Sequence, residues 1–585
     1  MTEAWEKSGD NWFYLDSNGE MATDQLIEDG DNYYHVDESG VMAVNKWVAV
    51  DNEDVGNDNE PQQWWYYFQA NGKAMQNSDN NVRLKTINGK KYAFDSDARM
   101  VYGWIQADDV SIINDDDDAW QKGDYYFGDE NDGTMTVGWK LLDITDEDAD
   151  TDVQNWINPA FTDDENQSRW FYFKANGKKT VGTVKDDGTV ELKETTINGK
   201  KYGFDEYGRM VAEWSYDSGS SATSSSATPS QAQSQSWKYF NSVADGARVN
   251  EGWFKVVPPE NLNSSDFDES EEGWYYADNK GHVYAQKLKS ISGKKYAFNE
   301  TGEMLDGMKF IRGKRSEPED VISDDDEKYP FDTEEDFDAN AGILAGMGYK
   351  CYYFGDEDDG AMRTGKVRVE IDGTTFDFRF GESGSRNGVG ITGKSDNKLY
   401  NSGKLVASAK DEKYQIVMRI IASEISEDPD ASETPDSLAL SDSSESPDAY
   451  DGFITCDDVE HFLEVLEQSD NPRYRVYRPD EWDPQDEEVA SLMEHTGLKF
   501  DNLKDATGMT SSAEDKYDNI CIFTTVNMST EEEKLGFSSD MTKDRGVCVV
   551  NTSGKISSNN AKNKDGNDVN INLYNDKLTA AYTED

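Results

Sequence analysis

The chain has 585 residues, and its 57 Lys and Arg stand against 119 Asp and Glu, a formal net charge of −62 at pH 7. A surface this acidic repels nucleic acid and anionic membranes, and it suits an extracellular surface or a cationic ligand. The length predicts about four domains of roughly 150 residues each. With 15 Trp, 30 Tyr and 24 Phe, we expect local aromatic cores rather than one large aliphatic core.

Short aromatic units recur from the first residues onward. "NWFYLDSNGEMATDQL" begins at Asn11 and "NYYHVDESGVMAVNKW" begins at Asn32, and their turn glycines, Gly19 and Gly40, are 21 residues apart. Each unit reads as aromatic residues, a polar turn with Gly, and then an apolar residue that is often Met. This pattern predicts a short strand, a turn with positive φ, and a return strand.

A longer period of roughly a hundred residues overlies these units. "WWYYFQANGKAM", "WFYFKANGKK" and "GWYYADNKGHV" are each followed by a segment of the type "INGKKYAFD" and then by a third aromatic hairpin. Acidic runs and the Ser-rich stretch 217–236 fall between the hairpins. We expect 217–236 to be a surface loop inside one repeat array that spans residues 1–420.

A literal phosphate-loop pattern, G-x-x-x-x-G-K-[ST], occurs at Gly388, Gly393, Lys394 and Ser395. Such a loop works only between a buried strand and a helix, where backbone amides meet the phosphates. Here the surrounding "ITGKSDNKLYNSGKLV" has the shape of the repeat units. We therefore predict a hairpin after Lys394 and a chance match.

The repeat pattern stops near Ile421. Residues 421–449 are acidic and rich in Ser and Pro, which predicts a flexible linker. Residues 450–540 predict a small inserted α/β or α+β module, with Val459, Phe462, Leu463 and Leu466 at helical spacing and Thr455 as the expected cap. Repeat-like hairpins are expected to resume over 541–585. An EF-hand placed around Gly452 fails, because Pro447 and Ala449 would occupy ligand positions.

The four cysteines, Cys351, Cys456, Cys521 and Cys548, show neither C-x-x-C spacing nor neighbouring His pairs. We therefore expect no zinc site, no other metal site and no cofactor, and we expect buried thiols for Cys521 and Cys548. No apolar run is long enough to span a membrane, and no signal peptide opens the chain. Because the sequence begins inside a structural unit, we expect its start to be a processed or internal end of a secreted protein.

The units resemble the cell-wall-binding, or choline-binding, repeats of Gram-positive surface proteins, a group that includes the glucan-binding repeats of glucosyltransferases. The likeness rests on the aromatic–Gly–Met units and on the Gly-Trp pairs 103–104, 138–139 and 252–253. It implies a mainly β fold: a β-solenoid of stacked aromatic β-hairpin repeats with acidic loop insertions. In choline-binding members of that family, a quaternary ammonium lies between hairpins in a cage of aromatic rings with a Met alongside.

By this resemblance, fourteen residues are candidate ligand contacts: Trp12, Tyr14, Met21, Tyr34, Met42, Trp47, Trp104, Tyr126, Trp139, Trp170, Tyr172, Trp253, Trp274 and Tyr276. The competing interpretation is that the same aromatic side chains only form the core. Irregular spacing and the loss of Gly-Trp pairs, as at Glu213-Trp214, leave a degenerate structural array or a glycan-stacking surface as alternatives.

No enzyme is indicated. His461 or His495 with Cys456 or Cys521 lacks any catalytic signature, and the many carboxylates point to no particular acid–base pair. We expect a secreted, wall-associated binding protein whose partner is cell-wall polymer, choline or a glycan, with no nucleic acid and no membrane insertion. The alternative is that the repeats are a display scaffold and that the 450–540 module binds a host or partner protein.

Overall fold

In the computed structural model, the chain is a mainly β protein, as predicted, with few and short helices. The structure describes residues 1–52, 61–144, 158, 167–186, 190–216, 236–314, 317–409, 412–423, 449–468, 474–477, 492, 495–496 and 518–583, apart from 115, 117, 528, 531, 559–561 and 566. The chain divides into two compact units. Unit 1 holds Met1–Tyr284 and Glu300–Gly302, and unit 2 holds Ala285–Asn299 and Glu303–Asp585.

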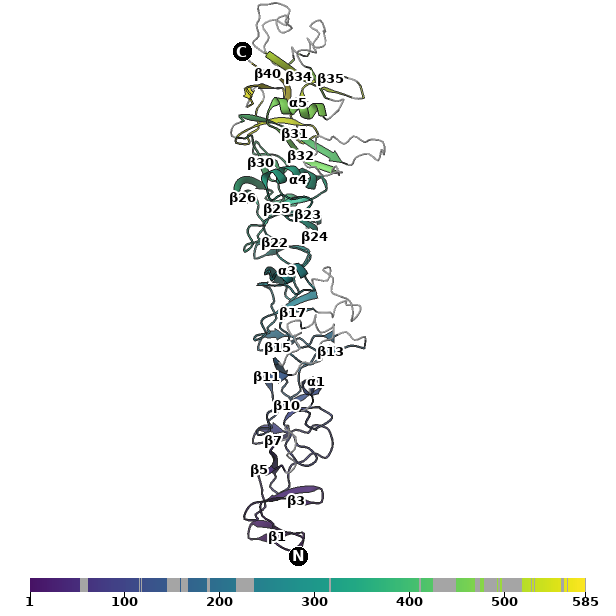
Figure 1. The fold of residues 1–585 in the computed structure, drawn as a ribbon, viewed down its shortest axis with the longest axis vertical. Coiled ribbons are helices and arrows are strands. Elements are labelled where there is room, and N and C mark those ends of the chain that lie inside the picture. The colour runs from purple at the N-terminus through teal and green to yellow at the C-terminus, as the bar shows by residue number, and fades with distance from the viewer. Residues whose placement is uncertain are drawn as a thin grey trace, which may run out of the picture. The chain divides into compact units, whose positions relative to one another are not determined.

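Unit 1 is a succession of antiparallel strand pairs, each made of two strands that follow one another in the chain (Figure 1). The pairs are β1 (Ala4–Ser8) with β2 (Asn11–Leu15), β3 (Gln25–Asp29) with β4 (Asn32–Val36), β5 (Lys46–Asp51) with β6 (Gln63–Phe68), β7 (Lys85–Ile87) with β8 (Lys90–Tyr92), β9 (Gly103–Ile105) with β10 (Tyr125–Phe127), β11 (Gly138–Ile144) with β12 (Gln167–Phe173), β13 (Thr183–Val184) with β14 (Val190–Glu191), β15 (Thr195–Ile197) with β16 (Lys200–Tyr202), β17 (Glu213–Tyr216) with β18 (Trp237–Phe240), and β19 (Gly252–Val256) with β20 (Gly273–Ala277).

The first hairpin corrects the predicted strand pairing. The turn at Gly19 forms as expected, and Asp16 Oδ1 accepts the backbone N–H groups of Asn18 and Glu20, both at 2.8 Å. The predicted return strand, however, is reduced to a single bridge between Leu15 and Met21. The aromatic strand β2 pairs instead with β1, the strand before it. A tight turn at residues 9–10 brings those two strands together, so the main hairpin lies one strand earlier than predicted.

Methionines connect successive hairpins. Met42 follows the turn glycine of its own repeat by two residues, and its Sδ lies against the turn at Gly72 in the next one, where an added Cβ would be 2.4 Å away. Met100 contacts Gly133 in the same way. Because a side chain larger than hydrogen does not fit at these turns, the Gly and Met of neighbouring repeats depend on each other.

One predicted loop lies largely outside the described residues, and another leads into a short helix. Of the Ser-rich stretch 217–236, only Ser236 is described, and the flanking strands β17 and β18 pair with one another. The acidic run after Ile113 leads into α1 (Ala119–Lys122), which lies inside the β9–β10 hairpin.

Unit 2 begins with similar hairpins and continues into larger sheets. Its first elements are β21 (Lys287–Ile291) with β22 (Lys294–Phe298), the three-stranded sheet of β23 (Met308–Lys314), β24 (Glu317–Ile322) and β25 (Lys350–Tyr353), and helix α4 (Glu334–Gly346). Thr333 caps α4, because its Oγ1 accepts the backbone N–H of Asp336 at 3.1 Å. A five-stranded sheet follows, in the order β26 (Gly365–Ile371), β27 (Thr374–Phe380), β30 (Lys404–Val406), β29 (Lys398–Asn401) and β28 (Gly393–Ser395).

The phosphate-loop match is a hairpin, as predicted. Lys394 lies within β28, which pairs with β29. A strand continues where a phosphate-binding loop requires a helix, so the match has no phosphate-binding context.

The C-terminal strands form two further sheets. β31 (Tyr414–Ser423) lies between β32 (Ala449–Cys456) and β37 (Val547–Asn551), so it extends past the predicted boundary at 420. A second sheet holds β33 (Tyr474–Tyr477), β34 (Asp518–Val526), β40 (Lys577–Thr583), β39 (Asn570–Tyr574) and β38 (Lys562–Lys564), with β35 (Glu533–Leu535) on β34 and β36 (Phe537–Ser538) on β40. Of the predicted linker 421–449, residues 424–448 lie outside the described residues. The domain boundaries remain predictions.

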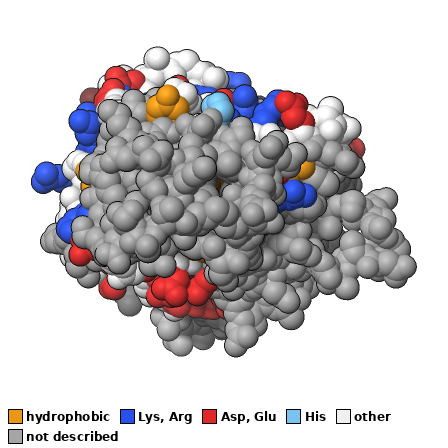
Figure 2. Space-filling view, turned by 90° about the horizontal axis from the view of Figure 1, so that it is seen from above, with side chains coloured by type: hydrophobic (Ala, Val, Ile, Leu, Met, Phe, Trp, Pro, Cys, Tyr) orange, Lys and Arg blue, Asp and Glu red, His pale blue; other side chains and the backbone are white. Residues whose placement is uncertain are grey.

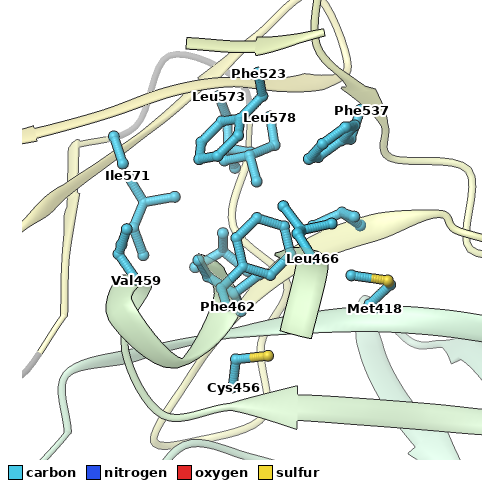
Figure 3. Close-up of a cluster of buried hydrophobic side chains, with 14 of the residues drawn as sticks. Met418, Cys456, Val459, Phe462, Leu466, Phe523, Phe537, Ile571, Leu573 and Leu578 are labelled. Carbon is cyan, nitrogen blue, oxygen red and sulfur yellow. The ribbon is translucent and has the colours of Figure 1, made fainter. Parts of the chain in front are cut away.

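Helix α5 (Val459–Gln468) carries the apolar face that its spacing predicts. Val459, Phe462 and Leu466 are buried together with Phe523 and Phe537 from the second sheet (Figure 3). The predicted cap is wrong. Asp458, not Thr455, caps the helix, because its Oδ1 accepts the backbone N–H of His461 at 2.7 Å.

The described cysteines are free thiols, three of them buried and Cys521 half-buried. Burial raises the pKa of Cys456 and Cys548 to about 12, so these thiols are unreactive at neutral pH. Among the described residues, no helix is both long and apolar enough to cross a membrane.

Figure 2 shows the molecule from above relative to Figure 1. In the described part of this face, Lys and Arg side chains lie beside Asp and Glu side chains, so the face carries both charges although the chain as a whole is acidic.

Candidate aromatic cages

In six strand pairs of unit 1, a Trp on the first strand lies opposite a Tyr on the second strand. The ring centroids of these cross-strand pairs are 5.0–5.4 Å apart: Trp5–Tyr14, Trp47–Tyr67, Trp104–Tyr126, Trp139–Tyr172, Trp214–Tyr239 and Trp253–Tyr276. Each pair is directly opposite in the strand register. Such aromatic pairs stabilise a two-stranded sheet that has little other core.

A third ring joins the pair from a hairpin later in the chain. Tyr34 lies 4.9 Å from Trp5, Tyr92 lies 4.9 Å from Trp47, and Tyr202 lies 4.8 Å from Trp139. The third ring is tilted against the Trp ring by 54°, 60° and 68° in these three sets. We call each set of three rings an aromatic cage and name it by its Trp.

The Trp5, Trp47 and Trp139 cages are open to solvent. All rings of the Trp5 and Trp139 cages are half-buried, and in the Trp47 cage only Tyr92 is fully buried. A methionine packs beside two of them: Met100 against the ring cluster of the Trp47 cage and Met210 against that of the Trp139 cage. A buried Phe also packs on the Trp in each of these two cages: Phe94 lies 5.8 Å from Trp47, and Phe204 lies 5.7 Å from Trp139.

The Trp104 and Trp214 cages are closed. Trp104 is 6% exposed and contacts Tyr126 and Phe171, while Trp214 is 4% exposed and contacts Tyr239 and Tyr275. Insertions cover both Trp rings. The chain at Gly123 lies against Trp104, and the Val257 carbonyl accepts the Trp214 Nε1–H at 2.8 Å.

Carboxylates lie near the Trp5 cage. Trp5 Nε1 donates to Asp29 Oδ2 at 3.2 Å. Burial, followed by the nearby charges of Glu3 and Asp29, raises the pKa of Tyr14, and burial and Asp29 raise that of Tyr34. Negative charge near these rings favours a cation at this position.

Seven of the predicted site residues lie in the aromatic cages. Tyr14, Tyr34, Trp47, Trp139 and Tyr172 belong to open cages, and Trp104 and Tyr126 belong to a closed one. Trp170 contacts Trp139 at 6.3 Å, and Trp253 contacts both Tyr276 and Trp274. Met42 holds the sequence position that Met100 and Met210 hold in their repeats, two residues after the turn.

Two predicted residues stand apart from the cages. Met21 is 49% exposed and lies against the turn at Gly40. Trp12 is 39% exposed, and its described contact is the Lys7 ammonium, 5.9 Å from the ring centroid.

Sequence reasoning missed Trp5, Tyr67, Tyr92, Tyr202, Trp214, Tyr239 and Tyr275. Trp5 precedes the first turn glycine and has no Gly before it, so a search for Gly-Trp pairs does not identify it. Tyr92 and Tyr202 lie in the repeated "KKYAF" and "KKYGF" segments. The recurrence of this Tyr-containing segment is the signal that could have identified them.

Unit 2 contains a cavity of about 1000 Å³ between α4, β30 and β32. At its wall the buried Lys404 ammonium binds Glu334 at 2.8 Å and Asp338 at 2.7 Å and lies 4.8 Å from the centroid of Phe376. Burial raises the pKa of Asp338. Asn401, which also lines the cavity, is 5% exposed, and its Oδ1 has no hydrogen-bond partner among the described residues.

The chain matches a family model in one segment. Residues 2–47 match the choline-binding repeat, and this segment contains the Trp5 cage. A curated relative, glucosyltransferase-S of Streptococcus mutans serotype c, is 26% identical over 282 residues, which is 42% of this chain and 16% of the relative. The chain thus spans about a sixth of that relative's length.

Two solved structures from Streptococcus pneumoniae are similar in part. Choline-binding protein F is 17% identical, with 69% of this chain and 99% of that chain covered and a TM-score of 0.25. The modular autolysin LytC, in complex with a synthetic peptidoglycan ligand, is 16% identical, with 53% and 51% covered and a TM-score of 0.27. The chain carries a choline-binding repeat, as the resemblance predicted.

Proposed function

We propose that the chain is a secreted binding protein of a Gram-positive cell surface that attaches to a wall polymer or glycan bearing choline or a related quaternary ammonium. The Trp5, Trp47 and Trp139 cages are the proposed contacts, and the stacked hairpins form a β-solenoid that presents them. The chain is proposed to bind rather than to catalyse.

The observation that carries the proposal is the repetition of one open three-ring geometry at three places. Three rings tilted against one another present several π faces to one point, as recognition of a quaternary ammonium requires. Each face contributes about 0.5–1 kcal/mol when exposed and about 2 kcal/mol when desolvated. The match of residues 2–47 to the choline-binding repeat supports the same ligand at the Trp5 cage.

The tilt of the rings favours a cation over a sugar. A sugar ring stacks on a flat, exposed aromatic face, whereas in these cages the Trp stands at 54–68° to each of the two Tyr rings. Trp12, at 39% exposed, is an exposed aromatic side chain that could serve a sugar as a stacking platform.

The test is a choline titration of the full chain, in which binding is monitored by Trp fluorescence and by calorimetry. Trp5→Leu, Trp47→Leu and Trp139→Leu each remove a ring while they keep an apolar side chain. We expect a saturable signal in the wild type that weakens in each variant, with Trp12→Leu as the unaffected control. Absence of a saturable signal in the folded wild type would rule out the proposal.

A second candidate places binding in unit 2, with the repeats as a display scaffold. The cavity of about 1000 Å³ with a buried and unpartnered Asn401 Oδ1 favours it. Under this alternative, choline leaves the fluorescence unchanged, and a partner protein binds the wild type but not a folded Asn401→Leu variant. Equal partner binding by both would argue against it.

A further inference from the structure

Besides its covering insertion and its Phe171 ring, the Trp104 cage differs from the Trp47 and Trp139 cages in the residue that follows the turn of the third-ring hairpin. In the Trp47 and Trp139 cages, the residue two after the third-ring hairpin's turn is Met100 or Met210, and each packs with the cage rings. In the hairpin that supplies Phe171 to the Trp104 cage, this residue is Lys179. Its backbone makes the equivalent bridge, Phe173 to Lys179, as Phe94 does to Met100 and Phe204 to Met210.

The Lys179 side chain enters the cage. Its Nζ lies 5.1 Å from the centroid of the Trp104 ring and 5.8 Å from that of Phe171. The same atom donates to the backbone carbonyls of Trp120 at 2.5 Å and Gln121 at 3.2 Å. Ring faces and carbonyl oxygens together satisfy an ammonium that water does not reach.

The low solvent exposure of Lys179 and Trp104 agrees with a cage that is already occupied. Lys179 is 4% exposed and Trp104 is 6% exposed. Burial lowers the pKa of Lys179 to about 7, while the charges of Asp205 and Asp124 act in the opposite direction. Below neutral pH the side chain is therefore a cation enclosed by the rings that would otherwise face a ligand.

We propose that Lys179 is the built-in occupant of the Trp104 cage, which it closes to external ammonium ligands, and that removing its side chain creates a site for a small alkylammonium ion. The inference rests on the proposed function insofar as the open cages take an ammonium ligand. Lys179 is then the residue that decides which cages are available.

The experiment is chemical rescue of the full-length Lys179→Ala variant by n-propylammonium chloride at pH 6. We expect the variant to melt at a lower temperature than the wild type. We expect n-propylammonium to raise its melting temperature by about 2–4 °C more than that of the wild type or of Lys91→Ala, an exposed-lysine control. Neutral n-propanol at the same concentration is expected to give no selective rise. A folded variant without this selective rise would overturn the proposal.

If Lys179→Ala does not fold, acetylation of the wild type by an N-hydroxysuccinimide ester gives a second test. Peptide mass spectrometry is expected to show Lys179 labelled much more slowly than its exposed neighbour Lys178. Equal labelling would contradict a caged amine.

The choline titration of the wild type separates the two proposals. If the wild type binds choline but Lys179→Ala is not rescued, the occupant role fails alone. If Lys179→Ala is rescued but the wild type binds no choline, the proposed function fails and the caged lysine stands.

Discussion

Replacing Gly72 by Ala tests whether successive hairpins depend on the Met–Gly contact. A Cβ at Gly72 would lie 2.4 Å from Met42 Sδ and 2.5 Å from its Cε, and the residue has φ of +81°. Gly89 is a matched control, because its φ is +82° but an added Cβ there meets nothing within 4 Å.

The two substitutions share one cost and differ in another. An L residue in the left-handed region costs about 1–2 kcal/mol. Overpacking against Met42 adds about 1–3 kcal/mol at Gly72 alone. We therefore expect Gly89→Ala to lower the stability by about 1–2 kcal/mol and Gly72→Ala by about 2–5 kcal/mol.

Thermal melting of the full chain is the assay, with the double variant Met42→Ala/Gly72→Ala as the internal check. Shortening Met42 removes the steric conflict, so we expect the double variant to lose less than the sum of its single variants, by about 0.5–3 kcal/mol. Equal melting temperatures for Gly72→Ala and Gly89→Ala would refute the reasoning.

Three further outcomes follow from described contacts. Trp47→Leu removes one ring from an open cage, so calorimetry is expected to show about 2- to 30-fold weaker choline affinity at that site. Unchanged affinity would contradict the role of the Trp47 cage in choline binding. The pKa of Lys179 falls on folding from 10.5 to about 7, so between these values the unfolded chain binds more protons. The stability of the wild type relative to Lys179→Met should therefore rise with pH by about 1.4 kcal/mol per unit above pH 7, and paired melts that keep a constant difference from pH 7 to 9 would count against this. Phe462 is fully buried in the C-terminal core, so Phe462→Ala is expected to cost about 3–5 kcal/mol in denaturant unfolding of that core, whereas a loss below 1 kcal/mol would mean that the core is wrongly assigned.

The sequence predicts the repeat period because each turn needs a residue that tolerates positive φ, and Gly19 and Gly40 mark these turns visibly. It does not predict which neighbouring strand an aromatic strand pairs with. The pattern around Trp12 and Tyr14 is compatible with both neighbours, and a return strand was the wrong choice.

The cages were predicted only in part, for a related reason. Tyr14 and Trp47 are recognisable inside one hairpin, but the third ring, such as Tyr92, comes from the next hairpin and only the fold brings it close. In the C-terminal part, the helical spacing around Phe462 was sufficient to predict α5. The sheet that covers it was not predictable, because it joins strands as distant as β34 and β40.

The most direct test of the account is calorimetric choline titration of the full chain beside the triple variant Trp5→Leu/Trp47→Leu/Trp139→Leu. The account predicts saturable binding in the wild type and in Trp12→Leu, and its loss in a triple variant that keeps its β-sheet circular dichroism. Unchanged choline binding by the folded triple variant would contradict the claim that the open cages are the binding sites.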